Sequence, residues 1–192
     1  MKTKKLTFLE ENFVVLDTIG DGSCFLHAIL QSFSKKYRKM NKKDKINMVM
    51  EIRHNLSNVL LEVNPDTNKT YYQSLSRGEI EEISQFVDQM KLDHMKNYIK
   101  SRKWINFTFL EFISDQFDID IYIFNDRDNT IYYTGDPDLY YKGRDSVLVN
   151  YIDDCHFESI GMLHNKKLYT FFSKDSEIIK KLKNHVMEKS KK

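Results

Sequence analysis

The sequence predicts an α+β protein in which helices come first and a mostly antiparallel sheet follows. Two observations lead to this prediction. Up to about residue 117, apolar residues recur at three- and four-residue spacing, which is typical of helices with one buried face. From Ile119 onward, short runs of β-branched and aromatic residues are separated by turn residues, which is typical of strands joined by hairpins. Helices and antiparallel strands in separate parts of the chain indicate the α+β class.

Length and composition predict one domain. The 192 residues are 41% hydrophobic, which is enough for one core, and no repeat or low-complexity linker divides residues 1–192. The formal net charge of +2 gives no general electrostatic reason to bind nucleic acid or a membrane. Two cysteines form neither a disulfide framework nor a CxxC metal pair, which suits a reducing compartment. With no membrane-spanning stretch and no apolar signal region, we expect a cytoplasmic monomer.

The helices are expected in the first two thirds of the chain. An apolar run from Phe13 to Leu16 leads into a stretch with two glycines, after which helical spacing begins at Phe25. A helical stripe over 46–60 follows, and then a loop or short turn-like segment over 71–75. A helix is expected over 80–90, with a capping box at 76 and 79, and the segment over 92–99 either continues that helix or starts another. A short helix over 110–117 has a capping box at 108 and 111.

The strands are expected in the last third. They cover 119–124, 130–133, 146–151, 155–160 and 168–172, and the fourth follows a turn at Asp153-Asp154. An amphipathic helix with Ile178, Leu182 and Val186 on one face ends the chain, so that a C-terminal strand and helix occupy about 167–189.

A basic cluster separates the first two expected helices. It has one nearby aromatic residue, Tyr37, whereas binding to single-stranded nucleic acid usually needs several stacking rings. We therefore interpret it as a solvated face. Its members are Lys35, Lys36, Arg38, Lys39, Lys42, Lys43 and Lys45.

The stretch Asp21-Gly22-Ser23-Cys24 has the features of a nucleophile loop. Cys24 is expected at the N-terminus of a helix, where free N–H groups and the helix dipole favour a thiolate. The glycine lets backbone N–H groups, from Asp21 through Cys24, point at a developing oxyanion. The alternative is a buried structural cysteine at a helix start, and this stretch alone does not decide between the two.

A second stretch, Cys155-His156-Phe157-Glu158, supplies a candidate base. In a strand, His156 and Glu158 share one face, so that Glu158 could orient the imidazole, while Cys155 points to the other face. This alternation argues against a metal site made of Cys155 and His156, and we expect neither a metal nor a cofactor. Taken alone, a histidine on a strand is more often a structural residue than a base. His27, three residues after Cys24, is a weaker candidate base because it would leave His156 and Glu158 unexplained.

Together these residues resemble the ovarian tumour (OTU) family of cysteine deubiquitinases. Asp21-Gly22-Ser23-Cys24-Phe25-Leu26, followed by Ala28, resembles the family's nucleophile motif, and Val147 to Asn150 leading to His156-Phe157 resembles its second motif. Trp104 ahead of a helix and the strand over 119–124 match its middle segment, so that the resemblance covers about 13–160. Glu158 departs from the Asn, Asp or aromatic residue that is common two positions after the histidine.

The resemblance implies a papain-like fold and hydrolysis of the isopeptide or peptide bond after the C-terminal Gly-Gly of ubiquitin. Cys24 would attack, His156 would transfer the proton, and either Asp21 or Glu158 would be the third catalytic member. The expected partner is ubiquitin or polyubiquitin, with ubiquitin-like modifiers as further candidates. The family motif marks Asp21 as an active-site residue, whereas its place in the loop also suits a role in holding the backbone.

Three other functions stay open from the sequence. A different papain-like peptidase is compatible with the separation of 132 positions from Cys24 to His156. A catalytically silent ubiquitin-binding domain would keep the fold without the chemistry, although the presence of both residues argues against it. Nucleic-acid binding through the basic cluster would require a strongly salt-dependent affinity.

Overall fold

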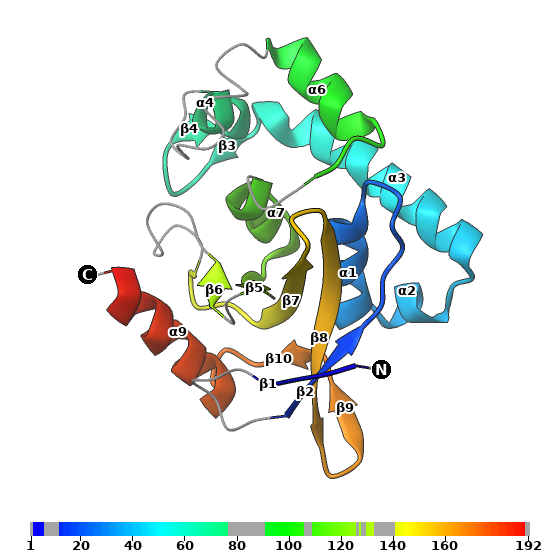
Figure 1. Ribbon diagram of the computed structural model, residues 1–192. Coiled ribbons are helices and arrows are strands. Elements are labelled where there is room, and N and C mark those ends of the chain that lie inside the picture. Colours follow the sequence, from blue (N-terminus) through cyan, green and yellow to red (C-terminus); the bar gives the residue numbers. More distant parts are fainter. Residues whose placement is uncertain are drawn as a thin grey trace.

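The chain forms a central sheet with helices packed around it, as the computed structural model in Figure 1 shows. The structure describes residues 2–5, 12–76, 91–105, 109–125, 127, 130–132 and 141–190. Helix α1 lies against β8 and β7, whereas α3 and α6 pack on each other at the top of Figure 1. The α+β class predicted from the sequence is therefore confirmed.

Most of the described helices follow the predicted periods, whereas the short helices over 35–39 and 71–76 were not predicted. The described helices are α1 (Cys24–Phe33), α2 (Lys35–Lys39), α3 (Lys42–Asn58), the 3-10 turn η1 (Val59–Leu61), α4 (Tyr71–Ser76), α6 (Leu92–Lys100), α7 (Leu110–Phe117) and α9 (Glu177–Ser190). The segment over 92–99 is thus a helix that begins at Leu92. The predicted helix over 80–90 and Thr108 of the second capping box lie outside the described residues.

The main sheet has the strand order β1-β2-β8-β7-β5-β6, with β10 beside β7 and β9 beside β8. All pairs are antiparallel except β5 with β7, so that the sheet is mostly antiparallel, as predicted. Its strands are β1 (Lys2–Lys5), β2 (Asn12–Leu16), β5 (Asp120–Asn125), β6 (Ile131–Tyr132), β7 (Ser146–Ile152), β8 (His156–His164), β9 (Lys167–Tyr169) and β10 (Phe171–Phe172).

The segment over 71–75, expected as a loop, is the helix α4 instead. It follows a small hairpin of β3 (Val63–Asn64) and β4 (Lys69–Thr70). Thr70 and Gln73 form a reciprocal capping box, because the Gln73 N–H donates to Thr70 Oγ1 at 3.1 Å and the Thr70 N–H donates to Gln73 Oε1 at 3.0 Å. This cap supplies partners for N–H groups of the first turn and allows a helix to start.

Helix α1 is joined to β8 by buried contacts, one between two aromatic rings and one between two hydroxyl groups. The rings of Phe25 and Phe157 lie 4.9 Å apart between centroids, and the hydroxyls of Ser32 and Ser159 form a hydrogen bond of 2.7 Å. An aromatic pair of this kind contributes about 0.5–1.5 kcal/mol beyond the area it buries. These contacts hold the helix that begins at Cys24 against the strand that begins at His156.

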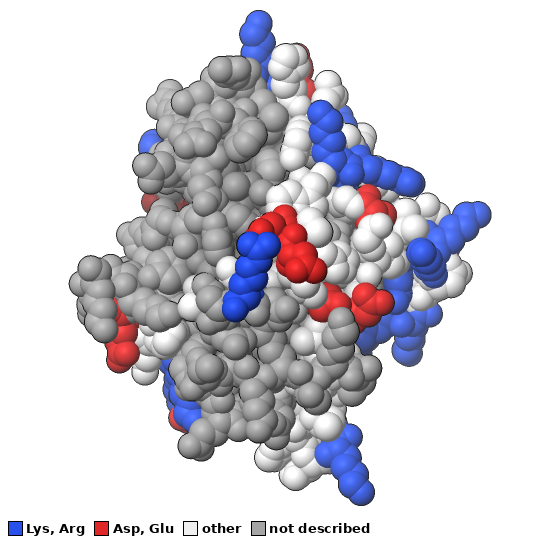
Figure 2. All heavy atoms as spheres, in the orientation of Figure 1, with Lys and Arg blue, Asp and Glu red and all other residues white. Residues whose placement is uncertain are grey.

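The basic cluster lies on the surface, as predicted. Its side chains in α2 are exposed, and Figure 2 shows Lys and Arg projecting outward at the right edge, where α2 and the start of α3 lie. Acidic side chains gather near the centre of the same face, over the β7–β8 turn that contains Asp153 and Asp154. Among the described residues, no helix is long and apolar enough to cross a membrane.

Candidate active site

Cys24 is the first residue of α1, and its side chain is only 2% exposed. Burial raises the pKa of the thiol above its ordinary value of 9.0, although backbone hydrogen bonds at Phe157, Phe25 and Cys24 itself and the indole of Trp104 lower it. The helix start therefore favours a thiolate, as the sequence predicts, but burial outweighs it. An isolated Cys24 thiol would stay protonated at neutral pH, so that it would need a base in order to act as a nucleophile.

Asp21 lies in the loop before Cys24 and holds that loop together. Its Oδ1 accepts a hydrogen bond of 3.0 Å from the Ser23 N–H and lies 3.1 Å from His27 Nε2. The other nitrogen of His27 is 2.6 Å from the Tyr37 hydroxyl. Burial lowers the pKa of His27, while the Asp21 carboxylate opposes that shift. His27 is therefore a buried link between Asp21 and Tyr37, and both of its nitrogens already have partners.

This arrangement changes the set of backbone donors available near Cys24. The sequence predicts an oxyanion site from the N–H groups of Asp21, Gly22, Ser23 and Cys24. In the structure the Ser23 N–H is bound to the Asp21 carboxylate, because the loop turns back on itself at that residue. The backbone hydrogen bonds that act on the thiol come from Cys24, Phe25 and Phe157.

Gly22 adopts a conformation that other residues rarely accept. Its φ is +84°, and a Cβ atom placed on it would lie 2.0 Å from the carbonyl oxygen of Arg102. The Gly22 carbonyl accepts a hydrogen bond of 3.3 Å from the Ile105 N–H. The nucleophile loop therefore packs directly on the backbone of residues 102–105, and only glycine fits there.

Arg53 of α3 fixes the same loop from inside the protein. Its side chain is fully buried, and its Nη1 donates to Ser23 Oγ at 2.9 Å and to the Gly22 carbonyl at 3.3 Å. The remaining donors reach carbonyl oxygens of Tyr98, Ile99 and Lys103. Burial lowers the pKa of Arg53 to about 10, because its partners are neutral acceptors. Arg53 thus ties the loop before Cys24 to the segment that leads to Trp104.

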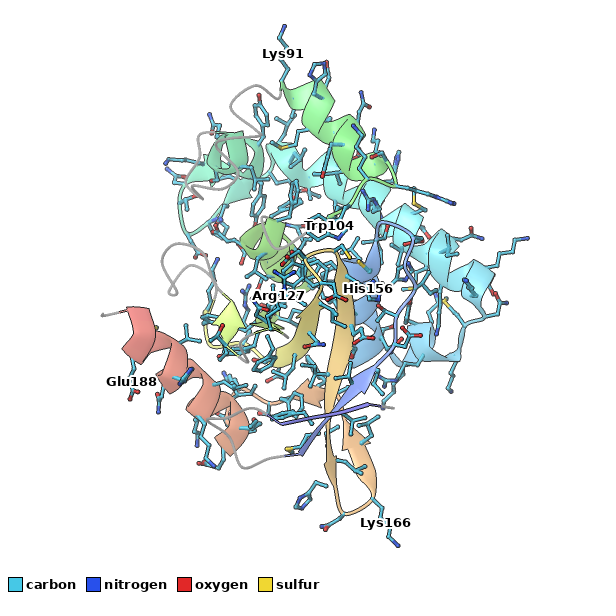
Figure 3. The ribbon with its side chains drawn as sticks, viewed as in Figure 1. Lys91, Trp104, Arg127, His156, Lys166 and Glu188 are labelled. Carbon is cyan, nitrogen blue, oxygen red and sulfur yellow. The ribbon has the colours of Figure 1, made fainter. Side chains whose placement is uncertain are left out.

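Trp104 lies beside the start of β8, near His156 (Figure 3). Its ring stacks on Phe157 with 5.8 Å between centroids and on Tyr151 with 6.3 Å. The indole Nε1 is buried without a conventional hydrogen-bond partner, and the indole lowers the pKa of Cys24. Its N–H therefore lies close to the thiol and can donate to the sulfur.

His156, the first residue of β8, has its ring held by Thr18. The Thr18 hydroxyl donates to the Phe157 carbonyl, and its oxygen lies 3.4 Å from His156 Nε2. Because the hydroxyl proton is committed to Phe157, the oxygen is left to accept from Nε2–H. A Cβ placed on Gly20 would lie 3.8 Å from Cε1 and 3.9 Å from Nδ1, so that the Cε1–Nδ1 edge of the ring faces the loop leading to Cys24.

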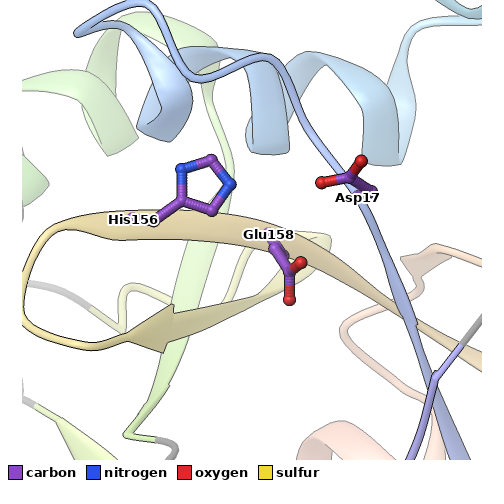
Figure 4. A group of neighbouring side chains, drawn as sticks. All are labelled: Asp17, His156 and Glu158. Carbon is purple, nitrogen blue, oxygen red and sulfur yellow. The ribbon is translucent and has the colours of Figure 1, made fainter.

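Two carboxylates flank the same histidine. Ligand atoms of Asp17, His156 and Glu158 all lie within 4.8 Å of one another, and Figure 4 shows one ring nitrogen of His156 pointing toward Asp17. The sheet register explains the arrangement, since Leu16 of β2 pairs with Ser159 of β8 and the next step places Asp17 opposite Glu158. Glu158 is 7% exposed and its Oε2 is buried without a hydrogen-bond partner, whereas Asp17 is exposed.

The structure thus brings together some predicted site residues and separates others. His156 and Glu158 share one cluster, whereas Asp21 is bound to Ser23 and His27. Cys155 is exposed in the β7–β8 turn. Of the described contacts, none is a hydrogen bond between the Cys24 thiol and the His156 ring, which is common for catalytic pairs without a substrate.

Four contributors were missed from the sequence: Asp17, Thr18, Arg53 and the indole N–H of Trp104. Asp17 and Thr18 directly follow an apolar strand and precede the glycines, and that position at a strand end could have indicated a site. Arg53 interrupts the apolar stripe of α3 at a buried position, which is a signal for a buried polar contact.

Neither a protein-family model nor a curated protein matches the sequence. Solved structures do match. An OTU domain solved in complex with ubiquitin has a TM-score of 0.59 at 16% identity, and the alignment covers 93% of this chain and 85% of that one. A viral OTU protease from Taggert virus (TM-score 0.49, 12% identity, 88% and 99% covered) and an OTU deubiquitinase from Wolbachia pipientis (0.47, 15%, 90% and 96%) also match. On the first of these likenesses, the chain has the fold of the OTU domain.

Proposed function

We propose that this chain is a cysteine deubiquitinase that cleaves the isopeptide or peptide bond after the C-terminal Gly-Gly of ubiquitin. The observation that carries the proposal is the packing of the helix start at Cys24 against the strand start at His156, with the imidazole oriented by Thr18. The solved OTU domain with the same fold is in complex with ubiquitin, which supports ubiquitin as the partner.

The first half of the reaction forms a thioester. Nδ1 of His156 takes the proton of Cys24, and the sulfur attacks the carbonyl carbon of the terminal glycine of ubiquitin. The tetrahedral intermediate then expels the lysine amine, which takes the proton back from the imidazolium. Because burial raises the pKa of the thiol, the proton transfer to His156 is required for attack at neutral pH.

The second half releases ubiquitin. Water attacks the thioester carbonyl and gives its proton to His156, and the carbon–sulfur bond breaks as the thiol regains a proton. The oxyanion of both intermediates would be stabilised by the N–H groups around the thiol, from Cys24 and the indole of Trp104. No step needs a cofactor.

Thr18 and the two carboxylates have distinct roles in this scheme. Thr18 accepts from Nε2–H and leaves Nδ1 as the base, while the charges of Asp17 and Glu158 stabilise the imidazolium when it forms. Of the two candidates for the third catalytic member, Glu158 therefore fits the histidine and Asp21 fits the loop. Asp21 would maintain the backbone on which Cys24 stands.

A catalytically silent ubiquitin-binding domain is the second candidate, since Cys24 is 2% exposed and is not hydrogen-bonded to His156. Turnover of ubiquitin joined to a lysine side chain by an isopeptide bond separates the two. The proposal predicts cleavage by the native chain and loss of cleavage in Cys24→Ala and His156→Ala, with Cys155→Ser as the matched control that keeps activity. Binding of ubiquitin without cleavage by the native chain would favour the silent domain.

A further inference from the structure

The cluster of Asp17, His156 and Glu158 also has the composition of a cation site. One imidazole and two carboxylates offer ligand atoms that all lie within 4.8 Å of one another. Nitrogen and oxygen donors of this kind suit zinc and neighbouring divalent transition ions. The sequence predicts no metal, because Cys155 and His156 point in different directions, but Asp17 joins His156 and Glu158 only through the sheet register.

The burial of Glu158 points to a ligand. Only 7% of the residue is exposed, and its Oε2 has no hydrogen-bond partner. A buried carboxylate oxygen without a partner costs free energy that a bound cation would recover. Among the residues that the structure describes, neither Asp17 nor Glu158 forms an ion pair with a lysine or arginine.

We propose that Asp17, His156 and Glu158 bind a divalent ion of the zinc class, and that the bound ion inhibits the enzyme. Zinc–ligand distances of about 2.0–2.2 Å place two ligands of one ion at most about 4.4 Å apart. The cluster therefore needs only a small contraction. Asp17 can provide it, because its side chain is exposed at the open side of the cluster while Glu158 is fixed inside.

The inhibitory effect rests on the proposed function. The ion would take the lone pair of Nε2 and replace the hydrogen bond to Thr18, and a proton carried by that nitrogen would pass to water. No electrons are transferred. An ion between Asp17 and Glu158 would hold the imidazole in place of Thr18, so that the ring edge with Nδ1 would no longer keep its position against the loop leading to Cys24.

Binding is tested first, without activity. The full chain with Cys24→Ala is titrated with Zn²⁺ by calorimetry, because this variant cannot chelate zinc between a thiol and His156. We expect one ion per chain. Asp17→Asn and Glu158→Gln in the same background should each weaken binding about tenfold or more. His164→Gln, at the exposed far end of β8, is the matched control and should leave the affinity unchanged.

The second measurement connects binding to inhibition. Zn²⁺ should reduce turnover by the native chain at the concentrations that saturate the site, a chelator should restore it, and Mg²⁺ should do neither. Absence of zinc binding by the Cys24→Ala chain, or binding that both carboxylate variants leave unchanged, would overturn the cation site. If zinc binds as expected but the native chain cleaves no ubiquitin, the site stands and the proposed function fails instead.

Discussion

The hydroxyl oxygen of Thr18 lies 3.4 Å from Nε2 of His156. Because the same hydroxyl donates to the Phe157 carbonyl, it can only accept from the imidazole. The contact therefore favours the tautomer with the proton on Nε2 and leaves Nδ1 unprotonated, as the proposed mechanism requires. In the proposed reaction, Thr18 thus fixes the proton on the ring nitrogen that lies away from the loop leading to Cys24.

Replacing Thr18 by valine removes this hydrogen bond while keeping the shape of the side chain. We expect kcat on a ubiquitin substrate to fall by about 10- to 100-fold, as for other partners that orient a functional histidine, with little change in KM. Thr18→Ser keeps the hydroxyl and should retain most of the activity. Equal turnover by Thr18→Val and the native chain would show that Thr18 does not orient the ring.

The pH dependence of alkylation tests the Cys24–His156 pair. Burial raises the pKa of the Cys24 thiol, so a thiol without a base should be mostly unreactive below its ordinary pKa of 9.0 and become reactive only above it. With His156 as the base, the native site should react with iodoacetamide already near neutral pH. His156→Ala should slow the reaction at pH 7 by about tenfold or more. Both proteins should carry Cys155→Ser, so that one thiol is measured. If the alkylation rates of the two proteins had the same pH dependence, His156 would not be the base for Cys24.

Gly22 and Gly143 form a matched pair for testing the nucleophile loop. Both have positive φ, +84° and +80°, but a Cβ on Gly22 would collide with the Arg102 carbonyl oxygen at 2.0 Å, whereas Gly143 has no neighbour within 4 Å. Gly143→Ala should cost roughly 1–2 kcal/mol of unfolding free energy from backbone strain alone. Gly22→Ala should cost more and abolish turnover. Urea unfolding and turnover check this, and equal effects of the two substitutions would contradict it.

Asp21 and Glu158 should differ in what their removal changes. Asp21→Ala leaves the Ser23 N–H and His27 without their acceptor, and each such loss typically costs about 1–3 kcal/mol. Glu158→Gln removes a buried charge that has no partner on Oε2, so it should lower turnover without lowering stability. Unfolding curves and turnover of both variants check the assignment. A stable Asp21→Ala variant, with a destabilised Glu158→Gln, would reverse it.

The fold was predictable where the sequence period was unambiguous. The apolar spacing of α1 predicted a helix with a buried face. The runs of β-branched and aromatic residues in β5, β7 and β8 predicted strands, and all of these elements form as expected. The helix α4 was missed because its signal is the Thr70–Gln73 cap rather than a period. Strand β1 carries three lysines in four residues, so that no hydrophobic pattern marks it.

The sequence predicted only those parts of the candidate site whose residues lie close together in the chain. The strand alternation of β8 brings His156 and Glu158 together, and the glycine-bearing loop leads to Cys24 at the helix start. Asp17 and Thr18 join the site through the register between β2 and β8, which no local pattern contains. Arg53 reaches the nucleophile loop across 30 residues of sequence, from Ser23 to α3. Such tertiary contacts depend on how elements pack, and propensity does not encode them.

The identity of the nucleophile can be measured with a ubiquitin whose C-terminus carries a thiol-reactive group. After reaction with the native chain, mass spectrometry of the digested adduct identifies the modified cysteine. We expect one ubiquitin per chain, attached to Cys24, with labelling lost in Cys24→Ala and retained in Cys155→Ser. Attachment to the exposed Cys155, or labelling that persists in Cys24→Ala, would contradict the claim that Cys24 is the nucleophile of a ubiquitin-directed active site.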